Sequence, residues 1–390
     1  MRGAYYRFKF KEHKMHKLGS SAVILVLAVF CALPLRAQET ATAKYKVNFY
    51  GQIKSDVSYD VHGVTGDDYT QYVASEKDSE RDYRASARGT RFGLDVTDGD
   101  KVSAKIETDF LGLSENVVNS TTTPGATADL RIRHAYVTLK AGKFEILAGQ
   151  TWNLLPLEFS GTNNEFAMGY SGVLWYRAPQ LRVTYKANDK VTFAAAAVRP
   201  TRKLTDSEGT ASGLPQAQVQ AQVKIGKAKF TLMGAAGKWR SVSGSALGKE
   251  GEVLLADFGY NIPLCSVATL NGQIWTGQNL FDFLGGIGNM GYGRAEVKAS
   301  GGFANILIKP AGRLSFNAAY GMDNPVDNRI AASATAKTMN TTLMANANYL
   351  VYDKVTVTLE AAKQVTEYKL AAGYEERENL HYQLSFKFPF

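Results

Sequence analysis

The chain has 390 residues and a formal net charge of +9, from 45 Lys and Arg against 36 Asp and Glu. It contains no run of about 18 apolar residues, which excludes a helical membrane protein. A hydrophobic content of 45% argues against disorder, and two cysteines, Cys31 and Cys265, are too few for a disulfide framework or a cysteine-rich metal site.

Residues 1–37 have the features of a cleaved secretory signal peptide. Seven basic residues and one acid surround the apolar run Ala22–Leu33, which is followed by Pro34 and the small residue Ala37. We expect cleavage after Ala37, so that residues 38–390 form the mature domain. The signal carries +6 of the net charge, and the remaining +3 forms no basic patch of the kind that binds nucleic acid.

The mature chain alternates between polar and apolar residues, a pattern that predicts β-strands almost throughout. In Val102–Phe110 the even positions are apolar or Thr and the odd positions are polar. Residues 181–186 repeat the pattern, and in Tyr382–Phe390 the aromatic and apolar side chains again share one face. No segment shows helical periodicity over three turns.

Short turns alternate with long polar connections along the chain. The seven short turns are centred on 98–100, 141–143, 188–189, 226–227, 261–263, 310–312 and 352–354. The eight long connections are 60–83, 112–129, 152–170, 199–215, 239–250, 277–290, 322–337 and 367–376. Together they delimit 16 strands.

A closed barrel in a membrane explains this pattern better than a soluble all-β repeat protein. Inside a bilayer every backbone polar group needs a partner in the protein, so an open sheet is excluded. Strands with apolar outer faces, joined by short turns at one end and long loops at the other, are typical of outer-membrane barrels. We therefore predict an all-β fold, a 16-stranded antiparallel transmembrane β-barrel wide enough for a water-filled channel.

Several segments resemble trimeric bacterial outer-membrane porins of the general-diffusion and DcaP-like kind. They are Phe49–Gln52, Thr90–Leu94, Arg131–Lys140, Phe144–Gln150, Tyr176–Arg182 and the aromatic strand that ends at Phe390. The resemblance is clearest over 45–186 and in the final strand. It implies an outer-membrane homotrimer in contact with lipid and lipopolysaccharide that passes small hydrophilic solutes, without a cofactor.

In such porins the third long loop folds into the barrel and narrows it. Here this loop is 152–170, and Pro156–Gly161 is similar to the family's Pro-Glu-Phe-Gly-Gly stretch, with Leu157 inserted and Ser160 in place of a Gly. The resemblance implies that Glu158 and Glu165 face a wall of arginines. The wall residues carried over are Arg91, Arg133 and Arg177, while Gln52 stands where the family has a basic residue.

Strand alternation gives a separate reason to point these arginines inward. Phe92, Leu94 and Val96 facing lipid would turn Arg91 inward. If Ile132, His134 and Tyr136 face outward, Arg131 and Arg133 face inward. If Leu174 and Tyr176 face outward, Arg177 faces inward. A bulge at Pro179 would then turn Arg182 inward as well. Alternatively, such arginines only solvate the lumen and pair with Glu107 or Asp109.

These observations predict a passive channel for small hydrophilic solutes and ions, with a mild preference for anions because the constriction is net positive. One alternative is a substrate-selective channel of the same fold for small anions such as dicarboxylates. Another is a non-conducting adhesin or structural barrel.

Nothing in the mature sequence indicates an enzyme. Its histidines are His62, His134 and His381, and neither a GxSxG nor an HExxH motif occurs. Residues 286–291 spell GxGxxG, but Tyr292–Lys298 alternates like a strand where a nucleotide site needs a helix. Turn chemistry explains the acids of 322–328 better than a metal site does, and the acidic connection 60–83 is predicted to be a solvated outer loop.

Overall fold

The computed structural model describes residues 45–66, 68, 70–77, 79–112, 129–201 and 207–390. The predicted signal peptide, its cleavage site and most of the connection 112–129 lie outside these residues. In the described part of the chain, no helix is long and apolar enough to cross a membrane.

The described residues form one antiparallel sheet of seventeen strand segments. The segments are β1 (Lys46–Asp60), β2 (Asp82–Ser86), β3 (Arg91–Thr97), β4 (Val102–Gly112), β5 (Asp129–Ala141), β6 (Phe144–Trp152), β7 (Arg177–Lys186), β8 (Val191–Val198), β9 (Gln216–Ile225), β10 (Ala228–Arg240), β11 (Glu250–Pro263), β12 (Ala268–Gln278), β13 (Lys298–Ile308), β14 (Leu314–Pro325), β15 (Lys337–Tyr352), β16 (Val355–Leu370) and β17 (Gly373–Pro389). The short helices are α2 (Ser207–Ala211), η1 (Gly244–Ala246), η2 (Leu280–Phe283), η3 (Gly286–Gly288) and η4 (Asp327–Arg329).

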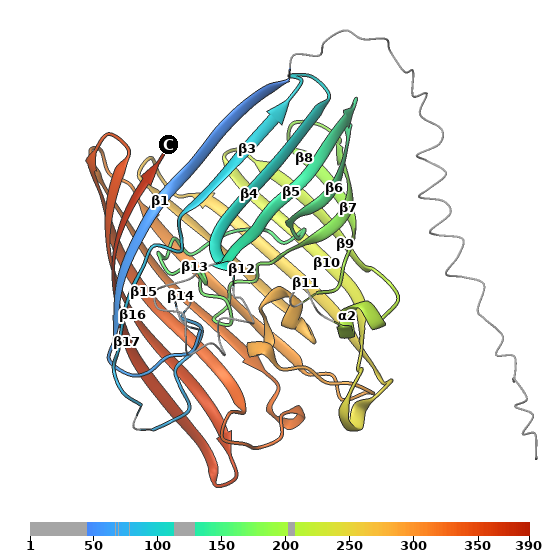
Figure 1. Cartoon of the computed structure of the whole chain (residues 1–390), viewed down its shortest axis with the longest axis vertical. Coiled ribbons are helices and arrows are strands. Elements are labelled where there is room, and N and C mark those ends of the chain that lie inside the picture. The colour runs from blue at the N-terminus through green and yellow to red at the C-terminus, as the bar shows by residue number, and fades with distance from the viewer. Residues whose placement is uncertain (1–44, 67, 69, 78, 113–128, 202–206) are drawn as a thin grey trace, which may run out of the picture. The chain divides into compact units, whose positions relative to one another are not determined.

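The sheet closes on itself into a barrel (Figure 1). β17 pairs with β1 from Gln52↔Pro389 to Asp60↔His381. β2 and β3 pair with successive stretches of β1, so they share one position that is interrupted at 87–90. Seventeen segments therefore occupy sixteen positions, and the predicted 16-stranded all-β barrel is confirmed.

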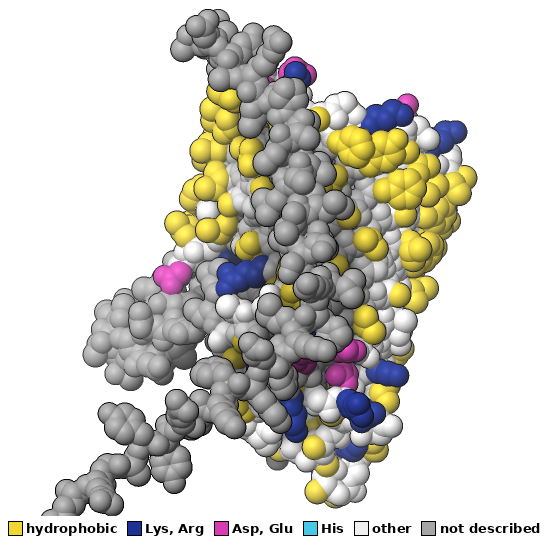
Figure 2. Space-filling model, turned by 90° about the vertical axis from the view of Figure 1, so that its right-hand side faces the viewer, with side chains coloured by type: hydrophobic (Ala, Val, Ile, Leu, Met, Phe, Trp, Pro, Cys, Tyr) yellow, Lys and Arg dark blue, Asp and Glu magenta, His cyan; other side chains and the backbone are white. Residues whose placement is uncertain are grey.

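Side chains alternate between the two faces of the barrel wall as expected for strands. In β17, Tyr382, Phe386 and Phe388 are exposed on the outer face, whereas His381 and Ser385, at alternate positions, are buried on the inner face. Figure 2 shows the resulting outer surface, with hydrophobic side chains over a broad area and Lys and Arg along the upper rim and toward the lower end. The polar inner face is the one that can hold water.

Most of the described connections agree with the prediction, and the largest difference is at the end of the chain. β16 and β17 are joined by only residues 371–372, with Leu370 paired to Gly373, so the long connection predicted at 367–376 is wrong. The strands continue beyond the apolar band with polar residues on both faces, including Lys369 and Glu375, and this composition resembles a loop. The turn predicted at 261–263 lies at 264–267 instead.

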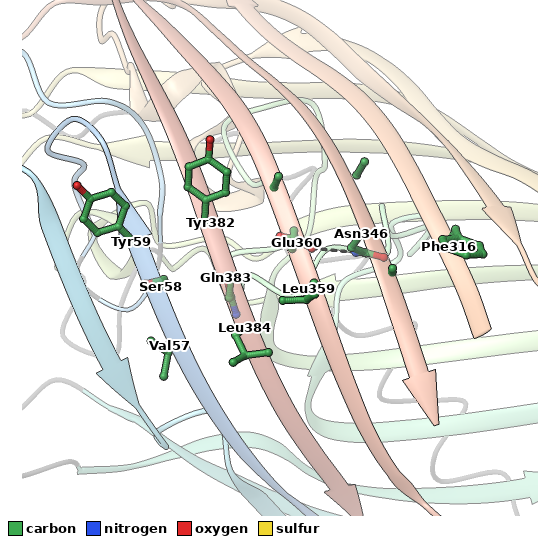
Figure 3. A pocket seen from close by; sticks show the side chains of 13 residues that line it. Val57, Ser58, Tyr59, Phe316, Asn346, Leu359, Glu360, Tyr382, Gln383 and Leu384 are labelled. Atoms are coloured by element: carbon green, nitrogen blue, oxygen red, sulfur yellow. Dashed lines mark hydrogen bonds between the residues drawn. The ribbon is translucent and has the colours of Figure 1, made fainter. Parts of the chain in front are cut away.

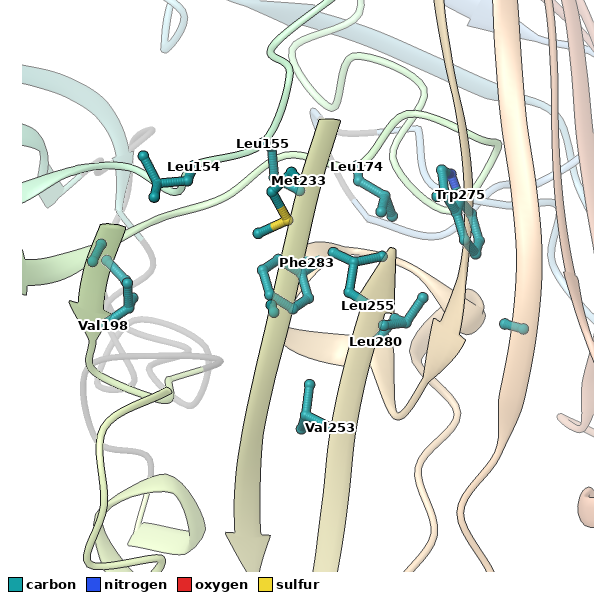
Figure 4. Packing of buried hydrophobic residues seen from close by; sticks show 14 of the residues in the cluster. Leu154, Leu155, Leu174, Val198, Met233, Val253, Leu255, Trp275, Leu280 and Phe283 are labelled. Carbon is teal, nitrogen blue, oxygen red and sulfur yellow. The ribbon is translucent and has the colours of Figure 1, made fainter. Parts of the chain in front are cut away.

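Two long connections, 153–176 and 279–297, pack against inner-face side chains of the strands. Leu155 and Leu174 of the first and Phe283 of the second meet Met233 and Leu255 in one apolar cluster (Figure 4). A second cluster joins them to later strands; its members include Phe166, Trp175, Ile287, Phe303 and Met344. One side of the barrel interior therefore contains a hydrophobic core.

Candidate functional site

A cavity of 250 Å³ lies between the inner faces of β1, β3, β5 and β17 and the connection 153–176. Six cationic side chains and one carboxylate line it. These are Lys54, Arg91, Arg131, Arg133, Arg177 and Lys387, with Glu165 opposite in sign. Of the predicted constriction residues, the cavity therefore brings together four arginines and Glu165, but not Arg182 or Glu158.

Arg131 and Arg133 are held by carboxylates of the neighbouring strand β4. Arg131 makes a bidentate contact with Asp109, at 3.0 Å from Nε to Oδ1 and 2.6 Å from Nη2 to Oδ2. Arg133 donates to Glu107 Oε1 at 2.5 Å and to Asp109 Oδ2 at 2.7 Å. The alternative in which inward arginines pair with Glu107 or Asp109 therefore holds for Arg131 and Arg133. This pairing offsets much of their charge.

A β-bulge on β5 brings two consecutive side chains into the interior. Glu107 pairs with His134 and Thr108 pairs with Ile132, so Arg133 is an extra residue between them. The extra residue reverses the alternation, because each residue added to a strand moves the following side chains to the other face. The prediction that His134 faces lipid is therefore wrong: it is buried, and its Nδ1 lies 2.9 Å from Thr151 Oγ1.

Arg91 and Lys387 have no carboxylate partner in an ion pair among the described residues. Arg91 lies beside Gln52, whose amide oxygen, in the orientation that satisfies both groups, accepts from Nε at 3.1 Å and Nη2 at 2.9 Å. Lys387 stands directly across the strand pair from Lys54. These two cations therefore keep more of their charge available to the cavity than Arg131 and Arg133 do.

Lys54 is a site residue that the sequence interpretation missed. Its Nζ lies 2.7 Å from Glu165 Oε1 and 3.1 Å from Asp56 Oδ2. It follows Gln52 by two residues on β1, so the same alternation argument would have placed it on the inner face. The basic residue expected at the position of Gln52 is thus supplied one step further along the strand.

Glu165 is the carboxylate of the connection 153–176 that meets the cationic wall. Burial alone would raise the pKa of the Glu165 carboxyl, but Lys54 and Arg91 outweigh that effect and the pKa lies below its ordinary value. The group is therefore ionised at neutral pH.

Glu158 does not face the arginines, contrary to the prediction. It is buried against the opposite wall, where Lys229 Nζ of β10 lies 2.5 Å from its Oε1 and Asn261 Nδ2 of β11 donates to its Oε2 at 3.1 Å. Its partners are distant in the sequence, so the local motif around Pro156 did not reveal them.

Arg177 and Arg182 differ in their surroundings. The Arg177 guanidinium lies over the Trp152 ring, 4.3 Å from its centroid, in a cation–π contact at the edge of the cavity. Arg182 also faces inward, but it donates to Gln180 and to the Trp152 carbonyl and does not line the cavity. The bulge predicted at Pro179 is not present in the β6–β7 pairing, which keeps one register to Trp152↔Arg177.

A larger hollow of 590 Å³ lies on the opposite, outer face of β1 and β14–β17 (Figure 3). Tyr59, Leu359 and Tyr382 line it, all of them exposed and apolar or aromatic. Glu360 also borders it but points through the wall to a hydrogen bond with Asn346. Because its lining carries no exposed charge, this hollow is not a site for hydrophilic solutes.

The remaining sequence motifs form no site in the described part of the chain. No cluster of three or more His, Cys, Asp or Glu side chains that could hold a metal ion occurs among the described residues. The GxGxxG sequence forms η3 and a loop, and β13 begins only at Lys298, later than the strand predicted from Tyr292.

Comparison with known proteins agrees with this architecture. The sequence profile of the Gram-negative porin family matches residues 21–258. The outer-membrane channel DcaP of Acinetobacter baumannii is 19% identical, with a TM-score of 0.70 over 90% of this chain and 99% of its own. The anion-selective porin of Comamonas acidovorans is 13% identical, with a TM-score of 0.58 over 89% and 100% of the two chains. No curated protein matches the chain significantly.

The two kinds of similarity support different statements. At these identities the solved structures show the shared barrel fold. The family profile covers more than half of the chain and extends from the region before β1 into β11. The chain therefore belongs to the Gram-negative porin family and is a channel of the outer membrane.

Proposed function

We propose that the channel passively conducts small hydrophilic solutes and ions, with a mild preference for anions. The observation that carries this proposal is the charge imbalance around the cavity, where six cations meet Glu165. Asp56, Glu107 and Asp109 offset part of it, which leaves six cations against four carboxylates. A small anion that passes such a wall is stabilised relative to a cation of the same size.

We propose further that the connection 153–176 narrows the channel. Its backbone and side chains contact inner-face groups on strands spread around the barrel: Glu165 pairs with Lys54, the Gly161 carbonyl accepts from Asn346, and the Gly172 carbonyl accepts from Trp275. With Glu165 on the loop and cations on the wall, a transverse field would act on a solute at the narrowest point.

Planar-bilayer recording tests both the channel and its ion preference. We expect stepwise conductance, and in a KCl gradient a reversal potential that indicates a mild anion preference and weakens at high salt. A clear cation preference would contradict the assignment of the cationic wall. Absence of conducting steps would contradict the channel and favour an adhesin or structural barrel.

A second candidate, a channel selective for small dicarboxylates, is favoured by the placement of Arg91 and Lys387. They lie on the strands that flank β1 on either side, so one carboxylate group of a solute could meet each of them. Succinate should then block the ionic current in a concentration-dependent way, and acetate at the same charge concentration should not. Equal currents in the two salts would favour general diffusion.

We also propose that the functional form is a homotrimer, embedded among lipid and lipopolysaccharide. The outer-membrane protein OmpT of Vibrio cholerae, which has a TM-score of 0.54 to this chain, has been solved in a trimer form. Sedimentation of the detergent-solubilised protein should give three times the mass of the mature chain. A monomer as the only species would contradict this assembly.

A further inference from the structure

The connection between β1 and β2 is not the solvated outer loop that its acidic composition predicts. Its six residues Thr70–Ser75, here called the inner segment, carry no charge, and within it Val73 is completely buried and Thr70 nearly so. The acids lie on both sides of this uncharged run. The uncharged stretch around Tyr72 and Val73 is the sequence feature that could have predicted this burial. It was not visible in the composition averaged over 60–83, which is acidic.

The inner segment is hydrogen-bonded to side chains of β15 and β16 and, through the Ser75 carbonyl, to Arg377 of β17. The Val73 amide donates to Thr366 Oγ1 at 3.0 Å, and its carbonyl accepts from the Tyr368 hydroxyl at 2.6 Å. Asn340 Nδ2 donates to the Gln71 carbonyl at 3.2 Å. Thr366, Tyr368 and Asn340 are themselves almost completely buried, so this segment lies inside the wall and not above it.

The inner segment is also joined to the connection 153–176. Asn340 donates to the Tyr170 carbonyl at 2.9 Å as well as to Gln71, so one side chain bridges the two loops. Asn164 Nδ2 donates to the Thr70 carbonyl at 3.4 Å. The Tyr72 and Tyr170 rings stand 6.4 Å apart. These contacts fix the position of one loop relative to the other.

Little space remains between the two loops. Two pockets lined by residues of both have volumes of 20 and 10 Å³, room for no more than about one water molecule each. The larger of them adjoins the cationic cavity, with which it shares Asn164 and Glu165. Along β1 this pocket is lined by Asp56 and Ser58, whereas the cationic cavity is lined by the preceding inward residues Gln52 and Lys54. Neither of these two pockets can therefore hold a solute larger than water.

We propose that the inner segment is a second narrowing element of the channel. It fills the lumen beside β15–β17 and holds the connection 153–176 in place, so two loops together set the size of solute that passes. This inference rests on the proposed function as a conducting channel. It assigns a size-determining role to Gln71, Tyr72 and Val73, which belong to the first long connection.

The test replaces the packing of the inner segment without changing the length of the chain. The combined variant removes the side chains of Gln71 and Tyr72 by Gln71→Gly and Tyr72→Gly, and replaces the apolar one of Val73 by a small polar one in Val73→Ser. The control changes Val242→Ser, Ser243→Gly and Leu247→Gly in the exposed connection 241–249. We expect higher single-channel conductance and entry of larger sugars in liposome swelling for the first variant only. Barrel formation is checked by heat-dependent mobility on gels.

A milder pair of variants covers the case in which the combined variant does not fold. Tyr368→Phe removes the hydroxyl that donates to the Val73 carbonyl, whereas Tyr374→Phe changes an exposed tyrosine of the same hairpin whose hydroxyl interacts with Asp327 and not with the inner segment. We expect a smaller rise in conductance for Tyr368→Phe and none for Tyr374→Phe. Conductance and sugar cut-off equal to those of the unaltered protein in folded variants would overturn the second narrowing element alone. An unaltered protein that does not conduct would overturn the proposed function.

Discussion

The two sides of the barrel interior are built from different interactions. Beside β1, β3–β5 and β17 the inner face carries paired and unpaired charges around a cavity, whereas beside β10–β13 it is covered by apolar side chains and two long connections. The charged side can set ion preference, and the apolar side can set where the loops lie. Because different strands supply the two properties, a substitution on one side should change one property and leave the other nearly unaffected.

The largest expected effect is a loss of stability on the charged side itself. Arg133→Ala leaves Glu107 and Asp109 buried with less compensation, and breaking a buried pair in this way costs about 3–5 kcal/mol. Equilibrium unfolding in urea with the protein in detergent measures the loss. The control Lys363→Ala breaks an exposed pair with Glu378 and should cost about 0–1 kcal/mol. Equal losses would mean that the buried pairs do not hold this wall together.

On the apolar side, Leu174→Ala should lower the free energy of unfolding by about 2–5 kcal/mol, because the fully buried side chain leaves a cavity under the connection 153–176. Ion preference should stay unchanged, which separates this variant from changes at the charged wall. Leu343→Ala, on the exposed outer face, is the matched control. A changed reversal potential for Leu174→Ala would show that the two sides are coupled.

Arg91→Gln should change selectivity with a smaller loss of stability than Arg133→Ala, since Lys54 remains 2.7 Å from Glu165 as its ion-pair partner when Arg91 is removed. A unit charge about 4 Å from a passing ion in water is worth about 1 kcal/mol, so the anion-to-cation permeability ratio should fall several-fold. Reversal potentials in dilute and concentrated KCl measure the ratio, and the difference should shrink in concentrated salt. Arg182→Gln, outside the cavity, should have the smaller effect; the reverse order would contradict the assignment.

The smallest effect is expected from pH. The pKa of Glu165 lies below its ordinary value, so its carboxylate stabilises the fold at every pH above the ordinary Glu value of about 4.3. That contribution is lost only as the pH falls through the lowered pKa. Between pH 8 and pH 5, the titration of Glu165 should therefore change neither the stability of the protein nor its ion preference. A change in ion preference between pH 7 and pH 5 that occurs in the unaltered protein and is absent from Glu165→Gln would contradict the lowered pKa of Glu165.

Local alternation was sufficient to predict the barrel and several inward side chains. Arg91, Arg131 and Arg182 lie on the face that the apolar residues beside them indicate, because the two-residue period depends only on adjacent positions. The closed sheet followed from the same pattern and from the need to satisfy every backbone group in a membrane.

Features that depend on one extra residue or on distant partners could not be predicted in this way. The bulge at Arg133 has no characteristic residue, and it reversed the face of His134. Glu158 finds Lys229 and Asn261 on strands more than seventy residues away along the chain. The buried inner segment required Thr366, Tyr368 and Asn340, which only barrel closure brings next to the first long connection.

The two-residue turn between β16 and β17 has a consequence for the outline of the protein at the cell surface. β15–β17 have 16, 16 and 17 residues, whereas β6–β8 have 9, 10 and 8. At about 3.3 Å per residue the long strands extend well beyond the apolar thickness of a bilayer, even when tilted. The rim formed by the described strands is therefore slanted, and the β16–β17 hairpin projects furthest beyond the apolar band among these strands.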